Sequence, residues 1–132
     1  MLQNGNNYMK SLNELNIKIF ADGAYLDKLN DYKSLDFIKG YTTNPSLMKN
    51  AGIVNYKDFA LKFMELVGDV PVSFEVFTDE IDEMKLQASE ISSWNKNIII
   101  KVPITNSKGI STKNLIKDLT DKNIQINVTA IF

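Results

Sequence analysis

The chain has 132 residues, 44% of them apolar, and a formal net charge of −1, which fits one folded unit with a single hydrophobic core. All 15 cationic side chains are lysine, and arginine, histidine and cysteine are absent. These absences exclude Ser-His-Asp and Cys-His triads, disulfide bonds, Cys/His zinc sites and bidentate arginine contacts to phosphate, and the near-zero charge argues against nucleic acid or an anionic membrane as partner. Acid–base chemistry in this chain therefore depends on Asp, Glu, Lys, Tyr or water.

The first 16 residues are polar and rich in asparagine. They lack the basic and then apolar order of a secretory signal, and no apolar run in the chain approaches the roughly 18 residues of a membrane span. We therefore expect a loosely ordered arm over residues 1–16, a folded part over residues 17–132, and a cytoplasmic location.

Strands and helices are predicted in alternation along the rest of the chain. Apolar runs rich in β-branched residues predict strands at 17–21, 40–43, 70–77, 97–102 and 124–132, the second being the least certain pattern. Helical spacing predicts helices over 26–35, over 56–67 with an end at Gly68, over 81–91 after an acidic first turn, and around 115–119 after Ser111 or Thr112 as cap. The alternation ends on a fifth strand.

Such an alternation predicts a parallel sheet with right-handed crossovers and helices on its outer surface. Two architectures fit this order. An open doubly wound sheet of flavodoxin type is commonly formed by five strands and about 130 residues. A (β/α)8 barrel normally needs about 250 residues and seldom fewer than about 200. Length alone favours the open sheet.

A polar residue stands near the carboxyl end of every predicted strand, where a strand buried on both faces should be apolar. These residues are Asp22, Asn44, Glu75, Lys101 and Thr129. In a barrel, the carboxyl ends of the strands converge on one mouth, where active sites of this fold are built. The five polar groups would then face one another.

Each of these residues also has a purely structural interpretation. Asp22 could cap the short helix that follows it, Asn44 before a proline is typical of a turn, and Thr129 is an ordinary strand former. Lys101 and Glu75 interrupt apolar runs, and burying two charges costs several kcal/mol each unless they pair or serve a function. A structural Lys101–Glu75 ion pair therefore remains open.

The functional interpretation of Lys101 is specific. Desolvation penalises a charged ammonium, and the neutral amine that results attacks a carbonyl carbon. The iminium formed with a ketone withdraws electrons from the neighbouring carbon–carbon bond, which is class I aldolase chemistry. A second group must accept and return a proton, and in a chain without histidine the candidates are the carboxylates Asp22 and Glu75.

Five stretches resemble the transaldolase family, in particular its short microbial type and the related fructose-6-phosphate aldolase. They are Phe20-Ala21-Asp22-Gly23-Ala24 with Leu26-Asp27, Thr42-Thr43-Asn44-Pro45-Ser46-Leu47, Val72-Ser73-Phe74-Glu75-Val76, Ile100-Lys101-Val102-Pro103-Ile104-Thr105 and Asn127-Val128-Thr129-Ala130-Ile131-Phe132. They occur in family order from about residue 17 to the last residue. The resemblance implies a (β/α)8 TIM barrel of class I aldolase type, here its first five strands, and overrides the argument from length.

The resemblance also implies roles for individual residues. Lys101 corresponds to the Schiff-base lysine, and Asp22 to the carboxylate that moves a proton as the carbon–carbon bond breaks. Glu75 and Thr129 correspond to the pair that activates a catalytic water. Asn44 corresponds to a donor that holds a substrate hydroxyl, and its neighbours Thr43 and Ser46 in the same motif are further candidates for substrate binding. No metal or organic cofactor is implied, because the lysine itself supplies the electron sink.

Glutamate rather than glutamine at position 75 resembles transaldolase more than fructose-6-phosphate aldolase. The resemblance thus implies transfer of a dihydroxyacetone unit between sugar phosphates, as in the pentose phosphate pathway, by a protein that is a homo-oligomer at full length. An aldolase that releases free dihydroxyacetone, or acts on an unphosphorylated or unusual sugar, is the alternative within enzymes.

The family binds the substrate phosphate through a serine and an arginine that follow its fifth strand, and this sequence contains no arginine. The matched positions recur about every 27 residues, so eight units would need about 215 residues. We therefore expect a fragment of a longer protein. A truncated, inactive chain that keeps aldolase residues as relics, and a barrel completed by another chain, are the other interpretations.

Overall fold

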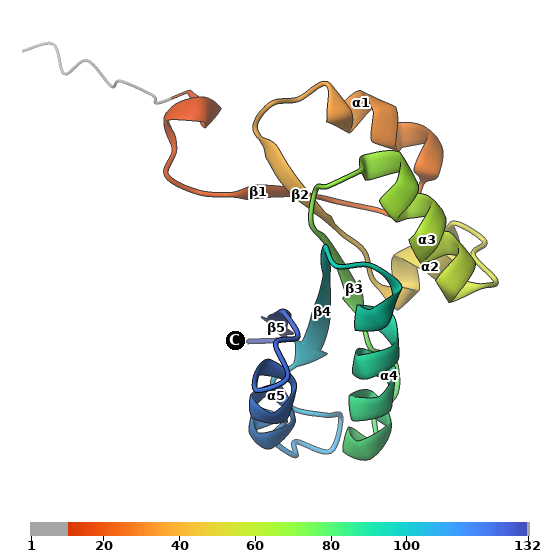
Figure 1. Cartoon of the computed structure of the whole chain (residues 1–132), viewed down its shortest axis with the longest axis vertical. Coiled ribbons are helices and arrows are strands. Elements are labelled where there is room, and N and C mark those ends of the chain that lie inside the picture. The colour runs from red at the N-terminus through yellow and green to blue at the C-terminus, as the bar shows by residue number, and fades with distance from the viewer. Residues whose placement is uncertain (1–10, 132) are drawn as a thin grey trace, which may run out of the picture.

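Five parallel strands form one sheet in the computed structural model, which describes residues 11–131. They are β1 (Ile19–Asp22), β2 (Ile38–Thr42), β3 (Val72–Glu75), β4 (Ile98–Pro103) and β5 (Ile126–Thr129). Their order in the sheet equals their order in the chain, and every neighbouring pair is parallel. Each connection therefore steps one strand in the same direction, and the sheet curls as the wall of a barrel does (Figure 1).

This strand order decides between the two predicted architectures. A doubly wound sheet reverses direction at a switch point, and the described sheet has no such reversal. The expectation of an open sheet from length alone is thus wrong, because periodicity and length do not report strand order. The prediction of an incomplete (β/α)8 barrel is confirmed.

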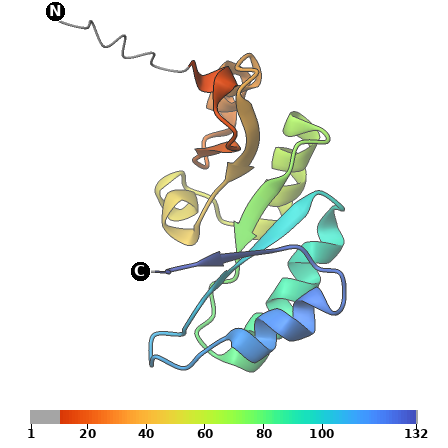
Figure 2. The same cartoon turned by 90° about the vertical axis from the view of Figure 1, so that its left-hand side faces the viewer.

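Helices connect the strands and cover the outer side of the curled sheet (Figures 1 and 2). The described elements are the 3-10 helices η1 (Leu12–Glu14) and η2 (Leu26–Lys28), followed by α1 (Leu29–Lys33), α2 (Pro45–Asn50), α3 (Tyr56–Val67), α4 (Ile81–Trp94) and α5 (Lys113–Thr120). None of the helices within residues 11–131 has both the length and the apolar character needed to cross a bilayer. Within the described residues, β1 to β4 are each followed by one or more helices, and β5 is the last strand.

The predicted strands and helices are present with several ends shifted, and the structure adds α2, which the sequence did not predict. Gly68 ends α3 with a positive φ of 71°, as predicted. Thr112 occupies the position before α5, but its hydroxyl donates to the Pro103 carbonyl instead of capping the helix. The predicted arm falls mostly on residues 1–10, outside the described residues. The predicted fifth strand is too long within the described residues, because β5 spans only Ile126–Thr129.

The hydrophobic core lies between the sheet and the helices. Phe74 of β3 packs edge-to-face against Phe59 and Phe63 of α3, with ring centroids 6.4 and 6.0 Å apart. Phe63 also packs edge-on against Tyr41 of β2, at 5.7 Å. Edge-to-face packing aligns the positive ring edge with the negative ring face and adds to the burial of apolar area.

On the opposite, inner face of the sheet, an aromatic ring lies over a glycine of the neighbouring strand. Phe20 of β1 pairs with Gly40 of β2, and a Cβ at position 40 would lie 2.2 Å from the Phe20 ring. A side chain at position 40 would therefore require the Phe20 ring to move. The remaining inner face, towards the carboxyl ends of the strands, carries the polar residues.

Candidate active site

Strand register places the predicted polar residues in rows on the inner face. Residues paired across parallel strands project to the same face, and the face alternates along each strand. One row consists of Asp22, Thr42, Ser73 and Ile99, and the next of Glu75, Lys101 and Asn127. Thr129 is paired with Pro103 one step further along. Four of the five predicted residues therefore share this face.

Lys101 occupies the centre of the second row. Its Nζ donates a hydrogen bond of 3.0 Å to the carbonyl oxygen of Thr43 and lies 3.4 Å from Oε2 of Glu75. The two side chains are only 12% and 22% exposed. The ion pair that the structural interpretation requires is therefore present, and it also keeps a carboxylate beside the amine.

Asp22 is the last residue of β1 and is exposed. The 3-10 helix after it begins at Leu26 behind Tyr25, so the interpretation of Asp22 as a helix cap is wrong. Two strands, β2 and β3, separate Asp22 from Lys101 in the sheet. Asp22 reaches the inner face because it is paired with Thr42 in the same row as Ser73.

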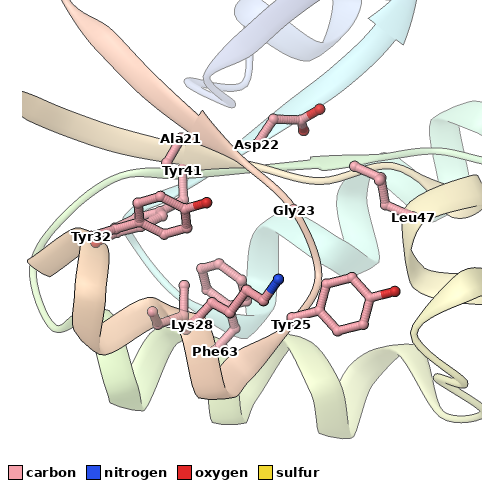
Figure 3. A pocket seen from close by; sticks show the side chains of 10 residues that line it. Ala21, Asp22, Gly23, Tyr25, Lys28, Tyr32, Tyr41, Leu47 and Phe63 are labelled. Carbon is pink, nitrogen blue, oxygen red and sulfur yellow. The ribbon is translucent and has the colours of Figure 1, made fainter.

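A pocket of about 200 Å³ is lined by Asp22 together with residues of the helix-covered side. Figure 3 shows the Asp22 carboxylate above the β1 ribbon and the side chains of Tyr25, Lys28 and Phe63 below it. The Lys28 ammonium lies 5.4 Å from the centroid of the Tyr25 ring, a cation–π contact. Most of the pocket thus lies on the helix-covered side, and Lys101 and Glu75 are not among its lining residues.

The Thr-Thr-Asn-Pro-Ser stretch is divided between the end of β2 and the first turn of α2. The Oδ1 of Asn44 accepts a hydrogen bond of 2.9 Å from the Leu47 amide and caps α2, so Asn44 begins a helix where its structural interpretation predicted a turn. Thr43 is fully buried, contributes its carbonyl to Lys101, and has a hydroxyl without a hydrogen-bond partner. Ser46 is exposed on α2. The structure thus brings Thr43 to the amine and uses the Asn44 oxygen elsewhere.

Two residues of the inner face were missed by the sequence analysis as site residues. Ser73 is 1% exposed, and its hydroxyl has no hydrogen-bond partner, a state that buried polar groups rarely adopt. Asn127 is paired directly with Lys101. Counting back two residues from Glu75 and from Thr129 would have found both, because side chains two apart share a face of a strand.

The loops beyond β3 and β4 are bonded to each other at the carboxyl edge of the sheet. The Asp79 carboxylate accepts hydrogen bonds from the Ser107 amide at 2.8 Å and the Ser107 hydroxyl at 2.6 Å. These bonds, the hydroxyl first, hold the pKa of Asp79 below its ordinary value. Nδ2 of the buried Asn106 donates to the Asp79 carbonyl, and Lys108 pairs with Glu80 at 2.7 Å. We call this group the loop clasp.

Comparison with known proteins gives a consistent result. The family model for Transaldolase/Fructose-6-phosphate aldolase matches residues 19–132. Proteins named probable transaldolase match 88% of this chain and 51% of their own length: the one from Thermoanaerobacter sp. (strain X514) is 36% identical over 118 residues, and the one from Clostridium kluyveri (strain NBRC 12016) is 37% identical over 116. A probable transaldolase from Methanococcus maripaludis (strain C6 / ATCC BAA-1332) is 36% identical over 118 residues. The chain spans about half the length of the curated relatives it matches.

Proposed function

Given that this chain belongs to the transaldolase/fructose-6-phosphate aldolase family, we propose that it carries the Schiff-base centre of a transaldolase. The observation that supports this most directly is the largely buried Lys101 amine, 3.4 Å from the Glu75 carboxylate, on the inner face of a parallel half-barrel. In this proposal the ion pair is a poised acid–base pair rather than a structural one.

The first step joins the ketose to the lysine. Glu75 takes a proton from the Lys101 ammonium, and the neutral amine attacks the ketone carbon of the sugar. The resulting carbinolamine loses water to give an iminium. Glu75 and Thr129 hold the water that carries protons in this step and in its reverse, hydrolysis. The iminium then draws electrons from the neighbouring carbon–carbon bond.

The second step breaks that bond. Asp22 accepts the proton of the hydroxyl on the carbon that leaves, an aldose departs, and a dihydroxyacetone unit remains on Lys101 as an enamine. In the reverse direction the enamine carbon attacks an aldehyde acceptor and Asp22 returns the proton. We assign the binding of substrate hydroxyls to the amide nitrogen of Asn44 and to Ser46, with Ser73 and Asn127 as further polar groups of the inner face. Thr43 is buried, so its part in the site is to hold the Lys101 amine through its carbonyl.

We assign the reaction to transfer rather than cleavage, and its substrates to sugar phosphates of the pentose phosphate type in the cytoplasm. Glu75 supports this choice, since the resemblance to transaldolase is stronger with glutamate than with glutamine at this position. The active assembly of the full-length protein is, in the same proposal, a homo-oligomer.

Trapping of the adduct tests the proposed centre. The folded chain is incubated with a ketose phosphate and sodium borohydride, which reduces the iminium to a stable secondary amine. Peptide mass spectrometry is expected to place the added mass on Lys101 and on none of the other lysines. Absence of an adduct on folded protein would contradict the Schiff-base centre and favour the interpretation of these residues as relics.

A comparison of rates separates the two reactions. Consumption of the ketose phosphate is measured with and without an aldose-phosphate acceptor. Transfer predicts a marked acceleration by the acceptor, because the enamine otherwise waits for hydrolysis. Equal rates with release of free dihydroxyacetone would show cleavage of the fructose-6-phosphate aldolase kind.

A further inference from the structure

The carbonyl oxygen of Glu75 has no partner in the sheet. On the side of β3 that faces β2, hydrogen bonds run from the Tyr41 amide to Pro71 and from the Thr43 amide to Ser73, at 3.0 and 3.2 Å. The next donor in this series would be the amide at position 45, two residues on, and its acceptor would be Glu75. Position 45 is proline, which has no N–H. A buried carbonyl at this point therefore needs a donor from elsewhere.

Tyr56 supplies this donor. Its hydroxyl donates a hydrogen bond of 3.0 Å to the Glu75 carbonyl oxygen. Tyr56 is the first residue of α3, and the start of that helix is fixed by Asn55, whose Oδ1 accepts from the Asp58 amide at 3.0 Å. A side chain on the helix side thus completes the end of the strand that carries Glu75.

Three aromatic rings hold the Tyr56 ring in place. Phe74 and Trp94 contact it edge-on, with centroids at 5.9 and 5.6 Å, and Phe77 lies at 5.0 Å in a tilted arrangement. Burial raises the pKa of the Tyr56 phenol, and the nearby negative charge of Glu75 acts in the same direction. The hydroxyl therefore keeps its proton, and with it its role as donor, across the neutral and moderately alkaline range.

We propose that Tyr56 is a positioning residue for Glu75: its hydroxyl replaces the amide that Pro45 lacks and so fixes the end of β3 with the Glu75 carboxylate beside Lys101. This inference rests on the proposed function for its catalytic consequence, whereas its structural part stands on the hydrogen bond and the ring contacts alone. Tyr56 acts through Glu75 and does not touch the substrate.

Tyr56→Phe tests the proposal because it removes the hydroxyl and keeps the ring. The first measurement is the carboxyl ¹³C resonance of Glu75 in the folded protein, which we expect to shift and broaden as the strand end loosens. The second is borohydride trapping on Lys101 as a function of ketose phosphate concentration. We expect the maximal rate to fall about five- to tenfold, the equivalent of one lost hydrogen bond, with the half-saturating concentration unchanged.

Tyr32→Phe is the matched control. Tyr32 lies along the outer pocket of Figure 3, away from Glu75, and its replacement should change neither measurement. Circular dichroism of both variants serves as the check that they are folded. A Glu75 resonance that Tyr56→Phe leaves unmoved would overturn this inference. If the unsubstituted chain forms no adduct while the resonance does shift, the proposed function fails and the positioning by Tyr56 stands.

Discussion

The two faces of the sheet are built from alternate residues of the same strands and differ in what they carry. In β4, Ile98, Ile100 and Val102 point to the helices and are at most 3% exposed. Ile99 and Lys101 point to the inner face and are only partly buried. The outer face therefore supplies the packing, while the inner face supplies the polar groups.

Because neighbouring residues of one strand face opposite sides, a residue that stabilises the fold stands directly beside one that serves the chemistry. A strand buried on both faces reads as one apolar run, so a polar residue within it marks the inner face. The loop clasp and Tyr56 are the exceptions, because they connect the two sides at the carboxyl edge. Substitutions on one face should then alter one property and spare the other.

Lys101→Met is expected to have the largest effect. Methionine keeps the length and the apolar stem of the side chain and removes the amine, so trapping by borohydride should vanish completely. The fold should survive, since the packing of β4 against the helices depends on its other face. Lys96→Met is the matched control, because Lys96 is largely exposed and distant in role. Residual adduct in the Lys101 variant would show that another lysine is the nucleophile.

Ile100→Ala and Ile99→Ala compare the two faces directly, with the same residue type at adjacent positions. Ile100 is fully buried under the helices, so its truncation should lower the free energy of unfolding by about 2–5 kcal/mol. The truncation of Ile99 on the inner face should cost less than half of that. Urea unfolding followed by circular dichroism measures both. Equal losses would show that the inner face contributes as much packing as the outer one.

Local patterns made Glu75 and Lys101 visible in the sequence, because a charge inside an apolar run is conspicuous. Ser73 and Asn127 were not noticed, since small polar residues are common in strands. Tyr56 fits the apolar stripe of its helix, and only the tertiary structure shows that its hydroxyl reaches Glu75. The role of Tyr56 therefore depends on a contact between segments that are distant in the sequence, which local patterns do not contain.

The fold divides in the same way. Alternation of strands and helices follows from periodicity and was predicted, whereas the order of the strands is a long-range property that periodicity does not contain. The helix α2 was missed because six residues are too few to show a helical repeat, although Asn44 and Pro45 are typical of a helix start. The resemblance to a family supplied the barrel that the local patterns left open.

Glu75→Gln tests whether the ion pair on the inner face is chemical or structural. Glutamine has nearly the same shape but cannot take a proton from the Lys101 ammonium, so the trapping rate should fall roughly 100-fold. The midpoint of thermal unfolding should change little, and Glu65→Gln on the exposed side of α3 should leave both properties unchanged. A large loss of stability with normal trapping per folded molecule would instead show a structural pair.

The loop clasp gives the smallest expected effect, at the edge where the two faces meet. Because Ser107 holds the pKa of Asp79 below its ordinary value, the clasp stabilises the fold above the unfolded-state pKa and loses this contribution as the pH falls through the folded-state value. Hydrogen exchange of the amides at residues 105–110, corrected for the intrinsic rate, should therefore accelerate in the acid range below about pH 4.

Asp79→Asn should show this faster exchange already at neutral pH, because an uncharged side chain accepts the two Ser107 bonds more weakly. Asp69→Asn is the control, since Asp69 is almost fully exposed and makes only long contacts, 3.9 Å to Lys96 and 3.4 Å to the Asn97 side chain. The trapping rate at Lys101 should fall less than for Glu75→Gln, because the loop clasp holds the loops and does not contact the Glu75 carboxylate. Asp79→Asn could instead leave both the exchange rates and the trapping rate unchanged. The Asp79 carboxylate would then hold neither the loops nor the active site, and the loops at the carboxyl edge would depend on their buried residues, such as Asn106, alone.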